Sequence, residues 1–253
     1  MTSLPNQTKR KLGLVIDLDT CVGCQACVTN CKEWNTGGHM APLTDTNPYQ
    51  AEADGVWFNR VHTYEVSTPE GDSRTLHFPR SCLHCEDAAC VTVCPTGASY
   101  KRTSDGIVLV DEDKCIGCKL CSWACPYGAR EYDVFEGVMK KCTLCVDRIY
   151  NKNLDEEDRV PACVLTCPTG ARHFGDLGDP RSSISKLVSA RSGQDLMPEM
   201  GYVPTNKYLP QREKTASFSL ATHHATARLQ PLEDTAGATG LLKWVDNALE
   251  KLG

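Results

Sequence analysis

The chain has 253 residues, a formal net charge of −5 and 16 cysteines. An acidic chain is not expected to bind nucleic acid, so that class of partner is excluded. The sequence shows no signal peptide and no run of about 18 apolar residues that would span a membrane. We therefore expect a soluble chain that reaches a membrane only through another subunit.

The cysteines fall into four groups of four, which we call quartets 1 to 4 in chain order. The quartets are Cys21, Cys24, Cys27 and Cys31; Cys82, Cys85, Cys90 and Cys94; Cys115, Cys118, Cys121 and Cys125; and Cys142, Cys145, Cys163 and Cys167. Neighbouring cysteines in one loop would make strained disulfides that close almost no chain. The spacing therefore favours metal ligation over cross-linking.

A short apolar or β-branched segment precedes each quartet. These segments lie at 12–16, 76–78, 107–110 and 138–139. They predict strands that lead into the ligand loops. The repeat of strand, ligand loop, short helix and turn predicts an α+β fold with few long elements, in which cofactors make up much of the core.

Two segments lie outside this repeat. Residues 32–73 predict an insertion that covers a cluster or faces a partner, and residues 179–253 predict a cysteine-free extension for partner docking. The extension is too rich in Ser, Thr, Ala and His to form a core of its own. Its last segment, 241–252, has helical apolar spacing and is expected to dock on a partner or to pack on its own domain.

The spacing within the quartets favours iron–sulfur clusters over zinc. Four-cysteine zinc sites use two separated Cys-x2-Cys pairs, whereas three cysteines within seven residues, as at 21–27, let one loop reach three corners of a cubane. A last cysteine followed by proline is the bacterial ferredoxin pattern, in which it binds the neighbouring cluster. Pro95, Pro126 and Pro168 fit that pattern. Among the last cysteines of the four quartets, only Cys31 is not followed by proline. All quartets are complete, so we predict four 4Fe–4S clusters, with a redox-inactive zinc scaffold as the alternative.

Other side chains near the ligands are candidates for supporting roles. Gly23 and Gly117 sit inside ligand loops, where a residue without Cβ lets backbone amides approach the sulfurs. Trp34 and Trp123 are expected to shield clusters from water or simply to pack. His84, between two cysteines, is expected to lie behind the ligands without replacing one.

Five cations also lie near ligands in the sequence. These cations could offset the negative charge of the clusters or simply face solvent. We favour exposure to solvent. They are Lys119, Arg130, Lys140, Lys141 and Arg172.

From residue 12 to about residue 175 the chain resembles the iron–sulfur subunits of the membrane-associated molybdoenzymes of the dimethyl-sulfoxide-reductase family. The order and spacing of the quartets carry this resemblance. It implies two interleaved bacterial-ferredoxin-like modules with two 4Fe–4S clusters each. The outer module would comprise 12–31 and 138–178, and the inner module 74–137.

The resemblance also implies that quartets exchange their last ligands, quartet 1 with quartet 4 and quartet 2 with quartet 3. Cluster 1 would take Cys21, Cys24, Cys27 and Cys167; cluster 2 Cys82, Cys85, Cys90 and Cys125; cluster 3 Cys94, Cys115, Cys118 and Cys121; and cluster 4 Cys31, Cys142, Cys145 and Cys163. No residue of the chain is expected to be catalytic.

The function implied by the resemblance is electron transfer between a molybdopterin-containing catalytic subunit and an integral-membrane, quinone-binding anchor subunit. The segments 7–49, 55–65 and 198–210 are most similar to the quinone-linked sulfite dehydrogenase subfamily, which implies sulfite oxidation to sulfate. It also implies a cytoplasmic location, peripheral on the inner membrane through the anchor, with export bound to a partner as the alternative. The alternatives in function are the same relay in a polysulfide, thiosulfate, tetrathionate or dimethyl sulfoxide reductase, and a free polyferredoxin.

Overall fold

The computed structural model describes residues 2–36, 55–67 and 73–212, which form short strands and helices around the cysteine loops. The strands are β1 (Leu12–Asp17), β2 (Asn59–Ser67), β3 (Ser73–Ser81), β4 (Ser99–Lys101), β5 (Val108–Val110), β6 (Glu131–Asp133), β7 (Val138–Lys140), β8 (Arg172–Asp176) and β9 (Lys207–Leu209). The helices are α1 (Ala26–Asn35), α2 (Ala89–Thr92), α3 (Leu120–Trp123), α4 (Val146–Ile149), α5 (Ala162–Leu165) and α6 (Ser183–Ala190), with 3₁₀ turns at Glu112–Lys114, Glu156–Asp158 and Pro198–Met200. The expected α+β character is confirmed.

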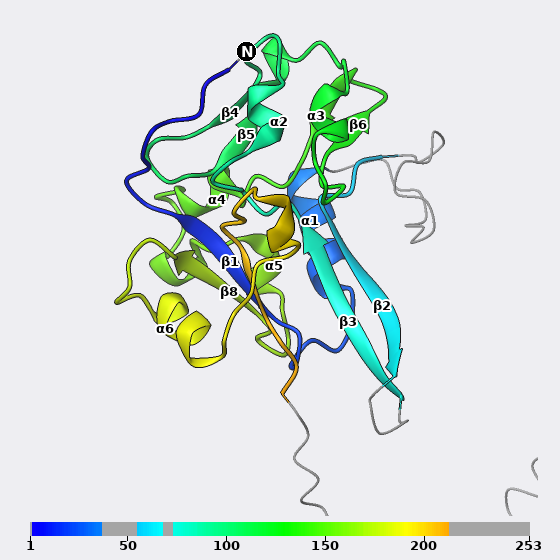
Figure 1. Cartoon of the computed structure of the whole chain (residues 1–253), viewed down its shortest axis with the longest axis vertical. Helices are drawn as coiled ribbons and strands as arrows, with labels where there is room; N and C mark the ends of the chain where they lie inside the picture. The colour runs from blue at the N-terminus through cyan, green and yellow to red at the C-terminus, as the bar shows by residue number, and fades with distance from the viewer. Residues whose placement is uncertain (1, 37–54, 68–72, 213–253) are drawn as a thin grey trace, which may run out of the picture. The chain divides into compact units, whose positions relative to one another are not determined.

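The central strand, β1, is buried along its whole length, as the apolar run at 12–16 favours. It pairs antiparallel with β8, with Leu14 opposite Phe174, and parallel with β9, with Ile16 opposite Tyr208. Figure 1 shows β1 and β8 side by side although most of the chain separates them in sequence. The sheet therefore joins the segment before quartet 1 to the segment after quartet 4.

The residues between β1 and β8 contain three hairpins. β4 pairs with β5 and β6 with β7, each over three residues. The predicted strands at 107–110 and 138–139 are confirmed in β5 and β7, and the one at 12–16 is confirmed in β1. The segment 76–78 lies inside the longer strand β3.

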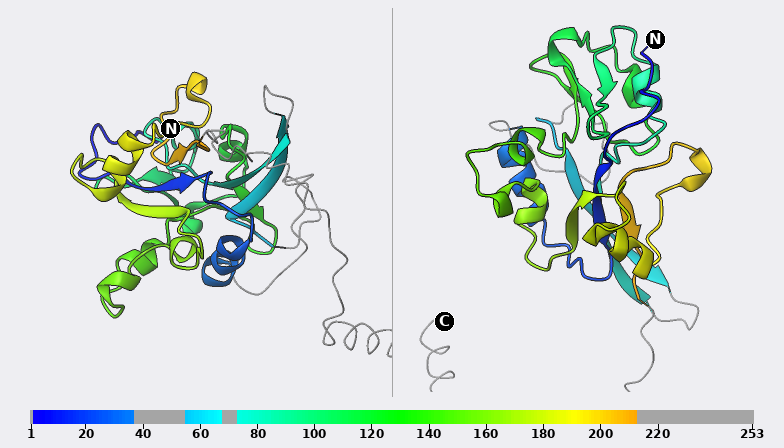
Figure 2. Two further views of the ribbon diagram at one scale, coloured as in Figure 1. Left: turned by 90° about the horizontal axis from the view of Figure 1, so that it is seen from below. Right: turned by 90° about the vertical axis from the view of Figure 1, so that its left-hand side faces the viewer.

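The hairpin of β2 and β3 is the longest paired element of the described chain. Its nine residue pairs run from Asn59 opposite Ser81 to Ser67 opposite Ser73 (Figures 1 and 2). The predicted insertion at 32–73 thus contributes the end of α1 and the whole of β2 to the structure. Whether the rest of that insertion covers a cluster concerns residues outside the described ranges.

The segment that follows β8 packs on the same unit. Leu209 of β9 and Ile184 of α6 form a buried cluster with Val15 of β1, and the compact unit extends to Arg212. The first part of the predicted extension, 179–212, is therefore integrated with the sheet. Partner docking by the remainder stays a prediction, and the segment 241–252 lies outside the described residues.

The largest apolar cluster combines aliphatic side chains with cysteines. Leu14, Ile16 and Leu144 belong to it together with Cys27 and Cys163. The cysteine loops are thus part of the core instead of appendages to it. Within the described ranges, no helix has the length and apolar character needed to cross a membrane.

Candidate iron–sulfur sites

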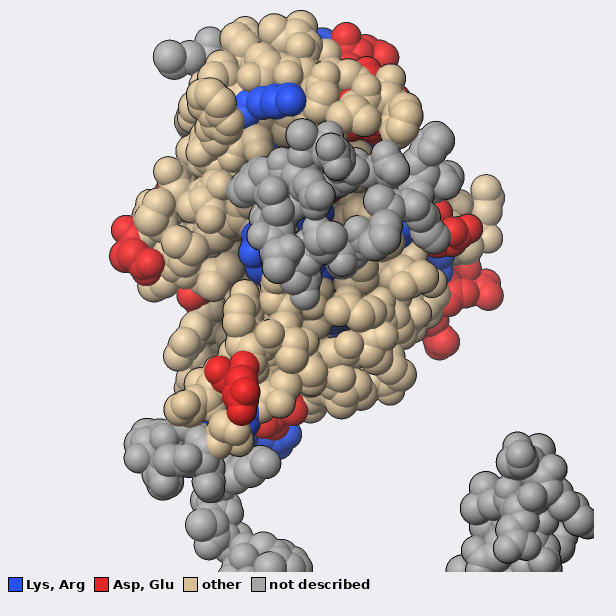
Figure 3. All heavy atoms as spheres, turned by 90° about the vertical axis from the view of Figure 1, so that its right-hand side faces the viewer, with Lys and Arg blue, Asp and Glu red and all other residues tan. Residues whose placement is uncertain are grey.

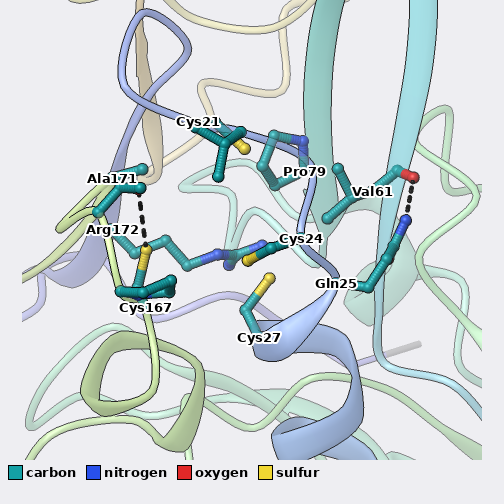
Figure 4. A pocket seen from close by; sticks show the side chains of 12 residues that line it. Cys21, Cys24, Gln25, Cys27, Val61, Pro79, Cys167, Ala171 and Arg172 are labelled. Atoms are coloured by element: carbon teal, nitrogen blue, oxygen red, sulfur yellow. Dashed lines mark hydrogen bonds between the residues drawn. The ribbon is translucent and has the colours of Figure 1, made fainter. Parts of the chain in front are cut away.

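The predicted ligands of cluster 1 line one cavity. Cys21 and Cys24 lie on the loop that leads from β1 into α1, Cys27 lies in the first turn of α1, and Cys167 follows α5. Figure 4 shows these side chains around a common space. Chain segments about 140 residues apart (from Cys27 to Cys167) therefore meet at one site, because β1 and β8 are hydrogen-bonded neighbours.

The predicted ligands of cluster 3 line a second cavity of the same construction. Cys115 and Cys118 come from the loop before α3, Cys121 lies in α3 itself, and Cys94 comes from the end of quartet 2. The cavity wall is completed by apolar side chains and by Thr96, Ser99 and Arg130. Each cavity thus contains three cysteines of one quartet and the last cysteine of another.

The predicted ligands of cluster 4 lie close together in the core. Burial raises the pKa of the Cys31 thiol well above its usual value, and negative charge on Cys142, Cys163 and Cys145 raises it further. The Asn35 side chain contacts this set, since its Nδ2 lies 3.5 Å from the sulfurs of both Cys31 and Cys145 and donates hydrogen bonds to them. Asn35 carried no signal in the sequence, because its position matters only once quartets 1 and 4 are adjacent.

The predicted ligands of cluster 2 are also neighbours. Burial raises the pKa of the Cys85 thiol, and the charges of Cys82, Cys90 and Cys125 raise it further. The structure therefore brings together the members of each of the four predicted sets.

Exposure differs sharply among the sixteen cysteines, all of which are described. Only Cys24 and Cys118 are exposed, and every other cysteine is buried or half-buried. They hold the same place, the second cysteine, in quartets 1 and 3. The equivalent residue of quartet 4, Cys145, is covered and accepts a hydrogen bond from the Ala162 amide.

Both Cys-x2-Cys-x2-Cys loops have the same backbone conformation. Gly23 and Gly117 have φ of +68° and +65°, and Gln25 and Lys119, the residues before α1 and α3, have φ of +61° and +62°. The Gly23 amide donates to the Cys21 sulfur and favours its thiolate. The expectation that glycine lets an amide approach a sulfur is confirmed there.

Hydrogen bonds and burial have opposite effects on the thiols. Burial raises the pKa of Cys142 to about 12 and that of Cys163 to about 11. At Cys94 and Cys167 burial acts in the same direction, but backbone amides and the hydroxyls of Thr96 (3.7 Å) and Thr169 (3.8 Å) lower the pKa. The sites therefore combine desolvated sulfurs with donors that stabilise thiolate, as iron–sulfur ligation requires.

The donor set fits clusters better than single ions or disulfides. All sixteen cysteines are free. Among the residues that the structure describes, no three His, Cys, Asp or Glu side chains are grouped so as to hold one metal ion. Four sulfurs that line one cavity without being grouped around a single tetrahedral ion fit a cubane.

The predicted cations behave in three different ways. Lys119 is exposed, with its Nζ 4.0 Å from the Tyr132 ring centre, and Lys140 pairs with carboxylates such as Asp133 at 3.1 Å. Lys141 is buried and donates to the carbonyls of Val108 and Cys142. Exposure to solvent is therefore the wrong interpretation for Lys141.

Arg130 and Arg172 are also buried, with exposed fractions of 2% and 3%. Solvent exposure is the wrong interpretation for them too, because both extend from the ends of quartets into the core between ligand sets.

The two tryptophans differ, since Trp34 packs on α4 whereas Trp123 does not shield a site from water in this chain. Trp123 is 86% exposed, so neither shielding nor packing describes it in this chain. Trp34 is 42% exposed, and its ring donates to Asp147 at 2.8 Å and stacks with Arg148. Within the single turn of α3, Cys121 is buried and Trp123 is exposed.

His84 is fully buried behind quartet 2. Its Nδ1 accepts a hydrogen bond from the Val108 amide at 3.1 Å. Burial lowers its pKa well below the usual value, which keeps the ring neutral. It lies in the ligand loop while every cysteine of the predicted set remains available, as expected.

Charged side chains are scattered on the face of the molecule in Figure 3. Among the described residues visible there, Asp and Glu form several separate groups near the edges, and Lys and Arg side chains are visible at several places between them.

Comparison with known proteins agrees with this geometry. Residues 73–177 match a 4Fe-4S dicluster domain and residues 18–34 a 4Fe-4S binding domain. A sulfite dehydrogenase subunit of Allochromatium vinosum is 61% identical over 203 residues, which are 80% of this chain and 84% of that protein. A putative dimethyl sulfoxide reductase iron-sulfur subunit of Halobacterium salinarum is 39% identical over 78% of each chain. A tetrathionate reductase subunit of Salmonella typhimurium is 36% identical over 79% of this chain and 73% of its own.

Proposed function

This chain belongs to the family of iron–sulfur subunits of sulfite dehydrogenase, dimethyl sulfoxide reductase and tetrathionate reductase, and on that premise we propose how it transfers electrons. It is the electron-transfer subunit of an oxidoreductase complex, and the catalytic site lies on a partner. We propose that it holds four 4Fe–4S clusters, assigned to the ligand sets named above, between a molybdopterin catalytic subunit and a quinone-binding membrane anchor.

The single observation that carries the proposal is the order in which the ligand sets adjoin one another. Cysteines of different sets lie near enough to influence each other at three places: Cys27 acts on Cys163, Cys82 on Cys142, and Cys90 on Cys121. These pairs order the sets as 1, 4, 2 and 3. A linear order is what a relay between two partners needs.

The ends of this line carry the exposed cysteines. Cys24 belongs to set 1 and Cys118 to set 3, whereas sets 4 and 2 have no exposed member. We infer that electrons enter and leave the chain at sets 1 and 3, each facing one partner. The covered inner sets keep water away from the steps between.

The sheet supports the proposal of two interleaved modules. β1 and β8 flank sets 1 and 4, and the hairpins β4–β5 and β6–β7 accompany sets 2 and 3. The outer module would be closed by β1 and β8, with the inner module inserted between them in sequence.

The clusters, when bound, supply reversible one-electron chemistry. The chain contributes sulfur ligands, amide and hydroxyl donors to those sulfurs, and an apolar core around the inner sets. The amides of Ser99 and Met139 each lie 3.3 Å from a ligand sulfur, Cys94 and Cys115 respectively. Such hydrogen bonds stabilise negative charge on the sulfurs and help to set potentials.

For the substrate of the complex we propose sulfite, oxidised to sulfate by the catalytic partner. The identity of 61% to a sulfite dehydrogenase subunit, against 39% and 36% to the reductase subunits, supports this choice. We also propose a cytoplasmic location, peripheral on the inner membrane through the anchor subunit.

Purification with the native partners tests the proposal. We expect the chain to co-purify with a large molybdenum-containing subunit and to contain about sixteen iron atoms and sixteen acid-labile sulfides. We expect the complex to reduce a quinone analogue with sulfite as donor.

Strong reduction of tetrathionate, polysulfide or dimethyl sulfoxide without sulfite oxidation would reject the substrate and retain the relay. Zinc in place of iron would reject the relay itself.

A Cys118→Ser variant tests the end of the line, since it removes a ligand of set 3. It is expected to stop quinone reduction by sulfite while the catalytic subunit still reduces a soluble dye.

A further inference from the structure

Two arginines occupy the same place in a repeated motif. Arg130 ends the segment Cys125-Pro-Tyr-Gly-Ala-Arg130, and Arg172 ends Cys167-Pro-Thr-Gly-Ala-Arg172. Both side chains are almost completely buried, at 2% and 3% exposure. The same position after Cys94 is Ser99, whose hydroxyl accepts a hydrogen bond from Arg130 at 2.7 Å.

Arg130 lies between ligand sets 2 and 3. Its Nη2 is 3.0 Å from the sulfur of Cys90, which belongs to set 2. It also lines the cavity of set 3 and hydrogen-bonds to Cys121 there. One guanidinium therefore contacts ligands of two neighbouring sets.

Arg172 occupies the equivalent place between sets 1 and 4. It lines the cavity of set 1, where Figure 4 shows its side chain reaching into the space among the cysteines. It hydrogen-bonds to Cys163 of set 4, while its Nη2 donates to the Asn59 side chain at 2.7 Å. The two arginines thus mark the two outer steps of the line.

Neither arginine has an anionic partner other than sulfur among the described residues. The acceptors of Arg130 and Arg172 outside the ligand sets are neutral, Ser99 and Asn59. Nε and Nη1 of Arg130 and Nη1 of Arg172 are buried without a hydrogen-bond partner in the described structure. A buried guanidinium without compensating charge is strongly unfavourable, so its charge must be balanced by the ligand sets on either side.

Negative charge on the cysteines favours the charged form of both arginines. Burial by itself would lower the pKa of Arg130, but the charges of Cys90, Cys121 and Cys82 raise it above its usual value. Burial and the charges of Cys163 and Cys27 oppose each other at Arg172 in the same way, and its pKa is also raised.

We propose that Arg130 and Arg172 each set the reduction potentials of the two clusters that flank them, Arg130 for clusters 2 and 3 and Arg172 for clusters 1 and 4. The inference rests on the proposed function, since it requires the four clusters. Reduction adds one electron, and therefore one negative charge, to a cluster, and a fixed cation at this distance favours the reduced form. Each arginine is a positioning residue that acts on two clusters at once.

A potentiometric titration followed by electron paramagnetic resonance tests the inference on the purified complex. In Arg130→Gln we expect the ratio of reduced to oxidised cluster, at fixed ambient potential, to fall about tenfold for one pair of clusters, a shift of about 59 mV for a one-electron couple. In Arg172→Gln we expect the same change for the other pair. Arg181→Gln, whose side chain is 90% exposed, is the matched control and should leave all four transitions unchanged.

Iron and sulfide content separates this inference from the proposed function. Wild-type protein without about sixteen irons per chain would overturn the function and the inference together. Full iron content with unchanged potentials in both variants would overturn only the inference, as would the same clusters shifting in both.

Arg130→Lys decides the case in which Arg130→Gln binds too little iron to titrate. It keeps the cation and loses the fork of donors. Wild-type iron content with reduced fractions within about threefold of the wild type supports an electrostatic role. Loss of iron from Arg130→Lys as well would overturn the inference, because the residue would then be needed for assembly alone.

Discussion

At Gly117 the ligand loop passes so close to another backbone segment that only glycine fits. A Cβ at this position would overlap the carbonyl oxygen of Gly137, on the turn between β6 and β7. Gly170 has the same positive φ of +65°, yet a Cβ there would meet nothing within 4 Å. Substitution of Gly170 therefore introduces backbone strain alone, whereas substitution of Gly117 introduces the same strain together with a steric overlap.

We expect Gly117→Ala to lose cluster 3, and with it about a quarter of the bound iron. The added methyl group must displace either the ligand loop or the β6–β7 turn. Gly170→Ala should carry only the left-handed strain of about 1–2 kcal/mol and keep its iron. Iron analysis and thermal melting of both variants make the comparison, and equal iron loss in the two would contradict it.

Element β9 shows how a distant strand completes the sheet. Tyr208 and Leu209 are buried against β1, and the Asn206 side chain accepts from the Leu14 amide at 2.8 Å. The same side chain donates to the Cys82 carbonyl at 3.0 Å. The strand segment therefore links the central sheet to the loop of quartet 2.

Two truncations test the role of this segment. Removing 213–253 should leave iron content and melting temperature unchanged, since the compact unit ends at Arg212. Removing 196–253 deletes β9 and exposes β1, which should cost more than about 3 kcal/mol from the burial of two large side chains alone. If the protein that lacks 213–253 keeps its iron but no longer co-purifies with the catalytic subunit, partner docking by the extension is supported. Equal stability of the two truncated proteins would contradict the role of β9.

For the molecule as a whole, the clusters take the place of a larger apolar core. Cysteines from all four predicted sets are buried, and several belong to the main hydrophobic cluster. Most helices are a single turn, too short to be stable without the packing around them. Metal binding and folding are therefore expected to be coupled.

Removal of iron with a chelator under reducing conditions should unfold the chain cooperatively. Circular dichroism would record the loss of structure together with the loss of visible absorption. A thiol reductant without chelator is the control, and it should have no effect because all sixteen cysteines are free. A chelated protein that retained its native spectrum would contradict the coupling.

Local pattern explains what could be predicted. The strands at 12–16 and 107–110 were readable because β1 and β5 are short apolar runs next to ligand loops. The strand β2 was not, because four of its nine residues are exposed and its stability comes from pairing with β3. The burial of Arg130 was missed for a similar reason: a cation near cysteines in sequence is as compatible with the surface as with the space between two ligand sets.

The sequence by itself determined the chemistry of this protein: the number, spacing and completeness of the quartets specify iron–sulfur ligation, because one loop must supply three corners of a cluster. Only the tertiary structure decided which ligands reach the surface, Cys24 and Cys118, and which cations lie between the sets, Arg130 and Arg172. These properties depend on contacts between segments far apart in the chain, above all the pairing of β1 with β8 and β9. Ligand spacing is local and can be read directly, whereas burial and the order of the sites arise only when the chain closes on itself.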